Sequence, residues 1–462
     1  MKSKSISSFV IVLLFLSFIS NSSMAQEVRR VETQASTLAA QINPPWTTEW
    51  VDSTSDDKAG SYPSIAFNPS NGQPYISYYD ATGTNLMLAK PYAPGDVSLC
   101  PGNPKWTCLL IDGEVSNVGK FSSIAFHHYG DIFKMGISYY DDDLRALKFA
   151  EFTPPDTWTI QLIEIPGLES LAFGWYTSLK YNSQGMASIA YFVSNSTGDD
   201  ELKYAENVLG NGNCGSGYAF KLWHCQVVDS GDLVGMYASL DIGWDGTIYF
   251  AYYDGGSGNL KFMMSGQYSP DTIAGASADV GISAVMLAPR KPGQTFRIAY
   301  YDKTNGELML ATWAGPGNLC DSSLIWECVT IDEIGGNLTR VGIAATLDRL
   351  GYPLIAYMNA FYDLAPTELY IARPAPALGE ETGNCGDVPP GYTFQYWFCQ
   401  TLDNAGYGYG DVNVADYTSI AVNSYGLAAI AYREVNYIEQ TTALKIAYQQ
   451  PPTFLPVVNR GQ

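Results

Sequence analysis

The sequence predicts an all-β protein: a seven-bladed β-propeller of four-stranded antiparallel blades, with the ring closed by the N-terminal strand. One unit of strand-like segments recurs seven times along the chain, which is typical of a repeat architecture. The 462 residues are rich in strand and turn formers, with 33 Tyr, 10 Trp and 44 Gly. The first strand-like segment (46–52) and the last repeat each lack a partner strand, and pairing the two would remove an exposed sheet edge.

Each repeat begins with a strand A, turns through Gly, Asn or Pro, and continues as a strand B, a short loop and a strand C. The first repeat reads YPSIAFNPSNGQPYISYYD over residues 62–80, and NLMLA follows in strand C. The repeats begin at residues 62, 121, 176, 237, 282, 341 and 417. One position of strand B holds a tyrosine in every repeat: Tyr78, Tyr139, Tyr191, Tyr252, Tyr300, Tyr357 and Tyr432.

A fourth strand, strand D, precedes every repeat except the fifth. Six segments carry an acidic residue six positions after a tryptophan: WTTEWVD (46–52), WTCLLID (106–112), WTIQLIE (158–164), WHCQVVD (223–229), WECVTID (326–332) and WFCQTLD (397–403). The final repeat stops after its strand C at Tyr448, whereas the segment at Trp46 is a strand D without a sheet of its own. We therefore place the propeller over residues 46–448, with 46–52 completing the last blade.

The N-terminus has the features of a targeting segment. Lys2 and Lys4 precede an apolar run at 9–19, and small residues favour cleavage after Ala25. We predict a signal peptide over 1–25, a flexible leader over 26–45 and a C-terminal tail over 449–462. A retained membrane anchor is the alternative, but the apolar run is shorter than the roughly 20 residues that span a bilayer. The expected location is therefore extracellular or at the cell surface.

The eight cysteines form four neighbouring pairs, and the second member of each follows a strand D tryptophan by two residues. An exported protein favours disulfides, whereas the absence of CxxC spacing and the presence of only three His argue against a metal site. Each disulfide would close the loop between strands C and D. The predicted disulfides are Cys100–Cys108, Cys214–Cys225, Cys320–Cys328 and Cys385–Cys399.

The chain is strongly acidic, with 46 Asp and Glu against 25 Lys and Arg and a net charge of −21. This balance argues against nucleic acid and anionic membranes as partners. We expect a monomer whose partner is a carbohydrate or an extracellular protein.

The recurring acidic residues should gather on one face of the ring, because the B–C and D–A loops of an antiparallel blade lie at the same end. The disulfides should lie at the other end. An acidic rim beside tyrosines suits sugar hydroxyls, a divalent cation or a basic peptide; the alternative for each acid is that it caps its own turn. The candidate ligand-binding acids are Asp80, Asp141, Asp254 and Asp302 after strand B, and Asp112, Asp229 and Asp332 after strand D.

Aromatic residues open strand A in five repeats and are candidates both for stacking on sugars at the channel mouth and for packing between blades. The candidate aromatic ligand contacts are Tyr62, Tyr176 and Tyr237, together with Trp175, which lies outside the recurring tryptophan position. No cofactor is expected to be required. The run Asp141, Asp142 and Asp143 is the best candidate for calcium, with a solvated acidic loop as the alternative.

The repeats resemble the sialidase-like superfamily of propellers over the whole region 46–448. The segment SLDIGWDGTIYF (239–250) is similar to the Asp-box S-x-D-x-G-x-T-W, but it lacks the final Trp. The string FRIAY places Arg297 in a pattern similar to the F-R-I-P string of sialidases, with Ala in place of Pro. The resemblance implies the architecture, and arginines available for a carboxylate-binding triad are Arg290, Arg297, Arg340 and Arg433.

Three functions remain open. The first is a secreted, non-enzymatic propeller that binds carbohydrate or a protein through the acidic, tyrosine-bearing face. The second is a glycan-cleaving hydrolase, which would need two carboxylates about 5–10 Å apart. The third is an extracellular scaffold or adhesion module. The most strongly recurring polar residues occur in many repeats instead of marking one, which favours binding over catalysis.

Overall fold

The computed structural model describes residues 44–450, apart from 54–57, 130–131, 155–156, 167–169, 209, 216–220, 276–277, 314–319, 321–324, 337, 339–340, 361–366, 376–381, 387–394 and 405–411. The predicted signal peptide (1–25), nearly all of the predicted leader (26–45) and the predicted tail beyond residue 450 lie outside the described residues.

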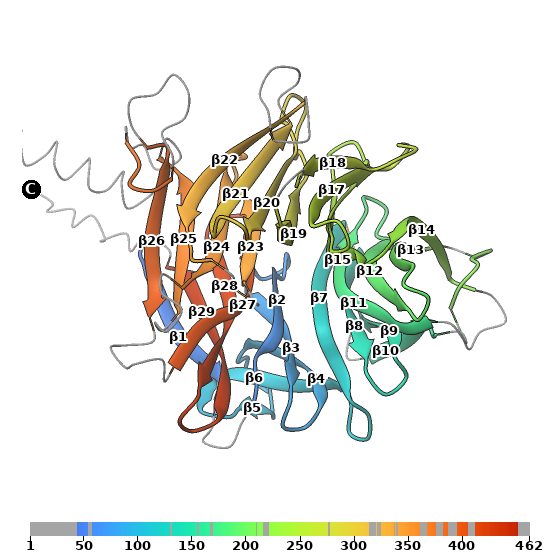
Figure 1. The fold of residues 1–462 in the computed structure, drawn as a ribbon. Coiled ribbons are helices and arrows are strands. Elements are labelled where there is room, and N and C mark those ends of the chain that lie inside the picture. The colour runs from blue at the N-terminus through green and yellow to red at the C-terminus, as the bar shows by residue number, and fades with distance from the viewer. Residues whose placement is uncertain are drawn as a thin grey trace, which may run out of the picture. The chain divides into compact units, whose positions relative to one another are not determined.

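Residues 46–449 form seven antiparallel sheets that follow one another around a ring (Figure 1). The first blade contains β2 (Ser61–Phe67), β3 (Pro74–Asp80), β4 (Asn85–Pro91), β5 (Leu99–Cys100) and β6 (Asn103–Asp112). The second contains β7 (Val118–Tyr129), β8 (Ile132–Asp141), β9 (Ala146–Thr153) and β10 (Thr157–Glu164). The third contains β11 (Ser170–Tyr181), β12 (Ala187–Asn195), β13 (Asp200–Asn207) and β14 (Trp223–Gly231), and the fourth contains β15 (Val234–Ile242), β16 (Ile248–Asp254), β17 (Asn259–Met264) and β18 (Asp271–Ala274).

The last three blades complete the ring. The fifth contains β19 (Val280–Leu287), β20 (Arg297–Asp302), β21 (Glu307–Trp313) and β22 (Trp326–Glu333). The sixth contains β23 (Ile343–Leu347), β24 (Pro353–Asn359), β25 (Glu368–Pro374) and β26 (Trp397–Asn404). The seventh contains β27 (Val412–Val422), β28 (Ala428–Asn436), β29 (Thr441–Gln449) and β1 (Trp46–Asp52). The predicted seven-bladed propeller is confirmed.

The ring is closed by its first strand, as the sequence predicts. Strand β1 pairs antiparallel with β29, so that Trp46 lies opposite Gln449 and Asp52 lies opposite Leu444. The outermost strand of the seventh blade therefore comes from the start of the propeller. Among the sheets of the described residues, no other contains strands from both ends of the propeller.

Two blades differ from the predicted repeat. The fourth blade does have an outer strand, but β18 is only four residues long and carries no tryptophan, which is why the sequence pattern misses it. The first blade has a fifth, two-residue strand, β5, which pairs with β6 beside the first disulfide.

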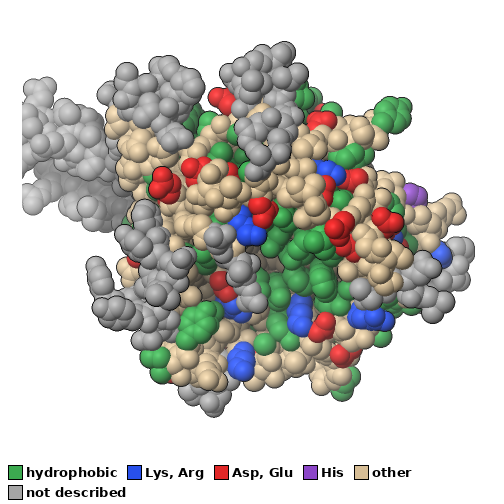
Figure 2. Space-filling model, in the orientation of Figure 1, with side chains coloured by type: hydrophobic (Ala, Val, Ile, Leu, Met, Phe, Trp, Pro, Cys, Tyr) green, Lys and Arg blue, Asp and Glu red, His purple; other side chains and the backbone are tan. Residues whose placement is uncertain are grey.

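The apolar core of the described residues is divided into seven clusters, one between each pair of neighbouring blades. Each cluster joins strands of two blades, so each blade depends on its neighbours for burial of its faces. The recurring tyrosine of strand B is buried in every blade, with at most 1% of its surface exposed. Figure 2 shows hydrophobic side chains gathered near the centre of one face of the ring, with charged side chains around them.

A glycine lies near the start of the innermost strand in five blades, because the chain passes directly over the preceding blade there. At Gly235 φ is +100°, and a Cβ atom would lie 2.8 Å from the backbone of Leu202. Such a contact excludes any other residue. The same approach recurs at Gly60, Gly119, Gly174 and Gly281.

All four predicted disulfides are present: Cys100–Cys108, Cys214–Cys225, Cys320–Cys328 and Cys385–Cys399. In the first blade Trp106, two residues before Cys108, pairs with Pro91 at one end of β4, whereas Asp112 pairs with Leu86 at its other end. The disulfides and the acidic residues therefore lie at opposite ends of the strands, as expected. Among the described residues, no helix has the length and apolar character needed to cross a membrane.

Candidate functional site

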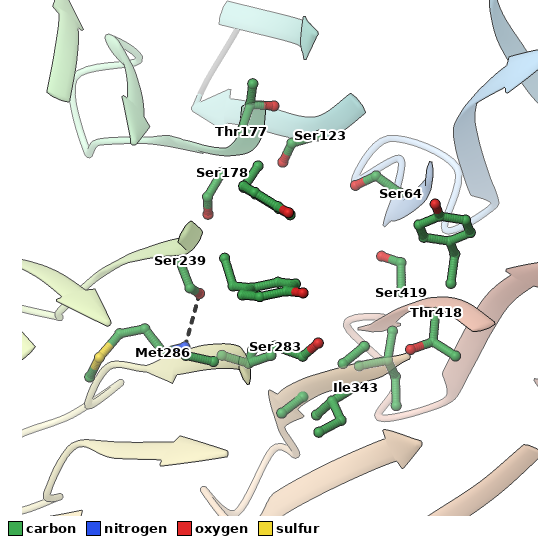
Figure 3. Close-up of a pocket in the computed structure, with 18 of the residues that line it drawn as sticks. Ser64, Ser123, Thr177, Ser178, Ser239, Ser283, Met286, Ile343, Thr418 and Ser419 are labelled. Carbon is green, nitrogen blue, oxygen red and sulfur yellow. Dashed lines mark hydrogen bonds between the residues drawn. The ribbon is translucent and has the colours of Figure 1, made fainter. Parts of the chain in front are cut away.

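The innermost strand of every blade lines an axial cavity of about 520 Å³ (Figure 3). Its wall is built by strand A of each repeat: β2, β7, β11, β15, β19, β23 and β27. The volume falls within the range of pockets that hold small molecules. This cavity is the candidate functional site.

Five aromatic side chains form a continuous series around the end of the cavity where strands A begin. We call this series the aromatic arc: Tyr417, Tyr62, Phe121, Tyr176 and Tyr237. Neighbouring ring centroids in the arc are 4.4–4.9 Å apart, with each ring tilted against the next. The rings come from five different blades and are half-buried. They therefore pack between blades, which is one of the two roles that the sequence left open, and they also line the cavity; stacking on sugars stays a prediction.

Four rings of the arc sit on residues with an uncommon backbone. Tyr62, Phe121, Tyr176 and Tyr237 have φ between 52° and 55°, in the left-handed region that bulky residues avoid. Strand pairing is shifted at each of these positions by a β-bulge. Residues in this region typically cost about 1–3 kcal/mol each, and such strain is concentrated at functional sites. The strained backbone recurs in four blades at the residue that carries the ring.

The arc is interrupted at the fifth and sixth blades. The equivalent position holds Ser283, which keeps the left-handed backbone with φ of 54°, and then Gly342. The Ser283 hydroxyl donates a 2.7 Å hydrogen bond to the carbonyl of Val341. A Cβ atom at Gly342 would lie 2.1 Å from the carbonyl oxygen of Ala415, so no side chain fits there. The aromatic lining therefore covers five of seven positions.

The hydroxyls of the arc lie close to one another. Burial raises the pKa of Tyr176 well above its ordinary value, and the neighbouring Tyr237 and Tyr62 raise it further; Tyr176 and Tyr237 share a hydrogen bond. The Tyr176 phenol therefore remains protonated and acts as a hydrogen-bond donor and acceptor at neutral pH.

One arginine is held against the arc. The guanidinium of Arg433 lies 4.7 Å from the centre of the Tyr417 ring, donates from Nε to Asp416 at 2.9 Å, and donates from Nη1 to Ser61 at 2.8 Å. A second bond joins Nη2 to Asp416. The four arginines offered by the sialidase resemblance do not converge in the described residues: Arg290 lines the other end of the cavity, Arg297 lies in β20, and Arg340 lies outside the described residues.

A second layer of the wall consists of serines that the sequence analysis missed. Ser239 accepts a 2.9 Å hydrogen bond from the backbone N–H of Met286 in the next blade (Figure 3). The same contact is made by Ser64, Ser123, Ser178 and Ser419. The signal was available, because a serine follows the aromatic residue by two positions in five repeats. Val285 and Ala344 replace it in the two blades where the arc is interrupted.

The predicted acids of strand D contact the neighbouring blade. Asp112 accepts a 2.6 Å hydrogen bond from the Tyr139 hydroxyl, and Nζ of Lys148 lies 3.0 Å from the same carboxylate. Burial raises the pKa of Tyr139 well above its ordinary value, and the nearby Asp112 carboxylate adds to this effect. The same bond, of 2.5–2.6 Å, recurs in Tyr78–Asp52, Tyr191–Glu164, Tyr252–Asp229, Tyr357–Asp332 and Tyr432–Asp403.

The boundary between the fourth and fifth blades is the exception. Strand β18 ends without an acid, and the Tyr300 hydroxyl lies 3.2 Å from Sγ of Cys328. At three further boundaries a lysine of strand C joins the tyrosine and the acid: Lys203 with Glu164, Lys261 with Asp229, and Lys445 with Asp403. The acids of strand D therefore link blades together. Ligand binding by Asp112, Asp229 and Asp332 stays a prediction.

The predicted acids after strand B cap their own turns. Asp80 accepts a hydrogen bond from the backbone N–H of Thr82 at 2.8 Å. Equivalent bonds of 2.8–3.2 Å join Asp141 to Leu144, Asp254 to Ser257 and Asp302 to Asn305. These are the turn contacts that the sequence offered as the alternative. A role for the same carboxylates in ligand binding stays a prediction.

The predicted calcium ligands at 141–143 have separate partners. The contacts are Asp141 with Lys148 at 2.8 Å, Asp142 with Lys120 at 2.6 Å, and Asp143 with the N–H of Asn117 at 2.9 Å. In the described part of the chain, no group of three His, Cys, Asp or Glu side chains is arranged to hold a metal ion. Calcium binding is a prediction without a supporting contact.

Trp175, the remaining predicted ligand contact, packs beside the arc. Its ring stacks on Phe121 with 6.1 Å between centroids and on Phe192 with 6.0 Å. It is half-buried and supports Phe121.

Comparison with known proteins concerns the fold. No protein-family model matches the chain, and no curated protein matches it in sequence. Among solved structures, the intramolecular trans-sialidase from Ruminococcus gnavus is 12% identical with a TM-score of 0.41, over 87% of this chain and 98% of that one. The α-L-arabinofuranosidase Arb93A from Fusarium graminearum is 11% identical with a TM-score of 0.43, over 87% and 97%. The Hadza microbial sialidase Hz136 is 10% identical with a TM-score of 0.41, over 87% and 68%.

Proposed function

We propose that this chain is a secreted carbohydrate-binding propeller, and that the sugar contacts the aromatic arc at the end of the axial cavity. The observation that carries the proposal is the arc itself: five half-exposed rings from five blades around a cavity of about 520 Å³. Aromatic rings with polar tips offer an apolar face to a sugar and a hydroxyl to its oxygens. A cavity of this volume suits a small molecule better than a segment of protein.

The carboxylates of the cavity favour binding over hydrolysis. Two carboxylates occur among the described lining residues, Asp416 and Asp241. Asp416 forms an ion pair with Arg433, and Asp241 forms one with Arg290 at 2.8 Å. Glycoside hydrolysis generally requires one carboxylic acid and one free carboxylate flanking the scissile bond. Carboxylates fixed in arginine pairs are poorly suited to either role.

The disulfide bonds support secretion. Four disulfides persist in an oxidising compartment and are rare in the cytosol. The N-terminal apolar run is consistent with export.

A glycan array with the purified chain, followed by titration calorimetry on the best ligand, tests the proposal. We expect saturable binding that Tyr237→Ala weakens by about tenfold and Tyr237→Phe weakens less, because the ring face is kept and only the hydroxyl is lost. The matched control is Tyr268→Ala, since Tyr268 is fully exposed. Equal binding by Tyr237→Ala and the unaltered chain would contradict the site. Release of chromophore from aryl glycosides, abolished in Asp416→Asn or Asp241→Asn, would instead show a hydrolase.

A further inference from the structure

The end of the cavity opposite the aromatic arc contains a lysine without a partner. Lys180 lies four residues after Tyr176 on β11, which places it about 13 Å further along the strand at 3.3 Å per residue. Its side chain lines the cavity and is exposed to the water of the channel. Within the described residues, no hydrogen bond or ion pair reaches its ammonium group.

The neighbouring carboxylate, Asp241, has its hydrogen-bonding capacity filled by other groups. It accepts bonds from Arg290 at 2.8 Å and from the backbone N–H groups of Ala288 at 2.9 Å and Ile242 at 3.0 Å. It is almost completely buried, with 2% of its surface exposed. Among the described lining residues at this end of the cavity, one carboxylate therefore faces two cations, Lys180 and Arg290, which leaves an excess of one positive charge. That excess is unusual in a chain of net charge −21.

The wall between the lysine and the arc presents hydrogen-bond donors. The Oγ atoms of four serines each accept a backbone N–H of the next blade at 2.9–3.1 Å, which leaves each hydroxyl hydrogen free to donate. In the part of the chain that the structure describes, no acceptor is bonded to these hydrogens. The four serines are Ser64, Ser123, Ser239 and Ser419, and Figure 3 shows them around the cavity.

We propose that this end of the channel binds an oxyanion, with Lys180 as the charged partner and the serine hydroxyls as neutral donors. Carboxylate, phosphate and sulfate share the chemistry that the wall requires: negative charge and several acceptor oxygens in a small volume. Hydrogen bonds between charged partners are the stronger kind, and an oxyanion would give the ammonium group a partner that the described residues do not supply.

The electrostatics of the lysine favour an anionic partner. Enclosure by the channel wall lowers the pKa of Lys180; Asp241 partly offsets this effect, and Arg290 adds to it. An anion bound beside the ammonium would favour its charged form and raise this pKa.

The oxyanion site is independent of the proposed carbohydrate site. It lies at the other end of the cavity and depends on charge, whereas the arc depends on ring faces. Loss of one site by mutation should leave the other intact, so each proposal can fail alone.

The test is titration calorimetry of the full chain with inorganic phosphate, sulfate, glucuronate and glucose at low ionic strength. We expect saturable binding of the three anions and none of glucose at this site. Lys180→Met should weaken anion binding by about tenfold or more, and Lys180→Arg should keep it within a few-fold, because the charge is retained. Lys105→Met removes the same charge from an exposed lysine, whose side chain is 76% accessible, and is the matched control.

The relative affinities of phosphate, sulfate and glucuronate distinguish an inorganic anion from a carboxylated sugar as the ligand. Binding of phosphate and sulfate at least as tight as that of glucuronate would indicate an inorganic anion, whereas a preference for glucuronate would indicate a carboxylated sugar. Both support the site. Absence of anion binding to the unaltered chain, or equal loss in Lys180→Met and Lys105→Met, overturns it. Thermal unfolding of each variant checks the fold, and ¹⁵N-lysine spectra of the unaltered chain give a second readout: phosphate should shift the ammonium signal that Lys180→Met lacks.

Discussion

The hydroxyl of Tyr139 donates a 2.6 Å hydrogen bond to Oδ2 of Asp112 across the boundary between the first two blades. Nζ of Lys148, in the same blade as Tyr139, lies 3.0 Å from the same carboxylate oxygen. A buried phenol and a partly buried ion pair thus join two sheets whose other contacts are mainly apolar. The equivalent tyrosine–acid contact at five more boundaries makes it a general device for joining blades.

Removal of this hydroxyl should destabilise the propeller. Tyr139→Phe leaves the partly buried Asp112 carboxylate without one of its donors, so we expect the free energy of unfolding to fall by about 1–3 kcal/mol. Urea denaturation followed by tryptophan fluorescence measures the change. Tyr268→Phe, at a fully exposed position, should change it by less than about 0.5 kcal/mol. Equal stabilities of the two variants would show that the contact contributes nothing.

Two aspartates should give opposite dependences of stability on pH. For Asp254, burial pushes the pKa up, but bonds from Lys261 and Ser257 outweigh burial and bring the pKa below 3.8. For Asp332, burial raises the pKa above 3.8 in spite of the bond from Tyr357. A lowered pKa contributes stability that is present above pH 3.8 and is lost as the pH falls through the folded-state value. A raised pKa has the reverse effect, and stability is gained as the pH falls toward 3.8.

Melting temperatures between pH 3 and 7 test this pair. The advantage of the unaltered chain over Asp254→Asn should shrink at the acid end of the range, whereas its stability relative to Asp332→Asn should grow as the pH falls. Parallel curves for the two variants would contradict the assignment.

The left-handed backbone of the arc should invert the usual ranking of alanine and glycine. Glycine in a strand is normally less stable than alanine by about 0.5–1 kcal/mol, but at φ of 52° alanine pays a penalty that glycine avoids. Tyr62→Gly should therefore be at least as stable as Tyr62→Ala in chemical denaturation. At Tyr75, in the regular strand β3, the same pair should show the normal order. A normal order at both positions would argue against the strained conformation.

The closing strand should contribute to the stability of the whole ring. Val51 in β1 is fully buried between the seventh and first blades, so Val51→Ala should cost roughly 1–3 kcal/mol. Val115→Ala, at a position 92% exposed, is the control and should be nearly neutral. If both variants unfold at the same urea concentration as the unaltered chain, the closure by β1 contributes little.

The architecture was predictable from the sequence because each repeat carries the same apolar alternation, the same tyrosine and the same strand D. Disulfides and ring closure follow from where the cysteines and the unpaired segment at Trp46 fall within that repeat. The short strand β18 was missed because it lacks the tryptophan that identifies strand D elsewhere.

The site was only partly predictable. Tyr62, Tyr176 and Tyr237 were found as aromatic candidates, but a β-bulge changes the direction of each ring. The alternation of apolar and polar residues along a strand does not reveal where such a bulge occurs. The sequence shows that acids and tyrosines recur together, yet it does not show that Asp112 meets the tyrosine of the next repeat. Lys180 and Asp241 break the repeat at single positions, where pattern matching across copies gives no signal.

Closure of the ring by β1 has a consequence for biosynthesis. Residues 46–52 leave the ribosome before any blade, but their partner strand is complete only when residue 449 has been made. Six sheets can assemble in order as they emerge, whereas the seventh must wait for a segment produced hundreds of residues earlier. The propeller is therefore completed only when its first and last synthesised strands pair. A nascent chain stalled before residue 441 would leave an unpaired strand edge on each side of the gap in the ring.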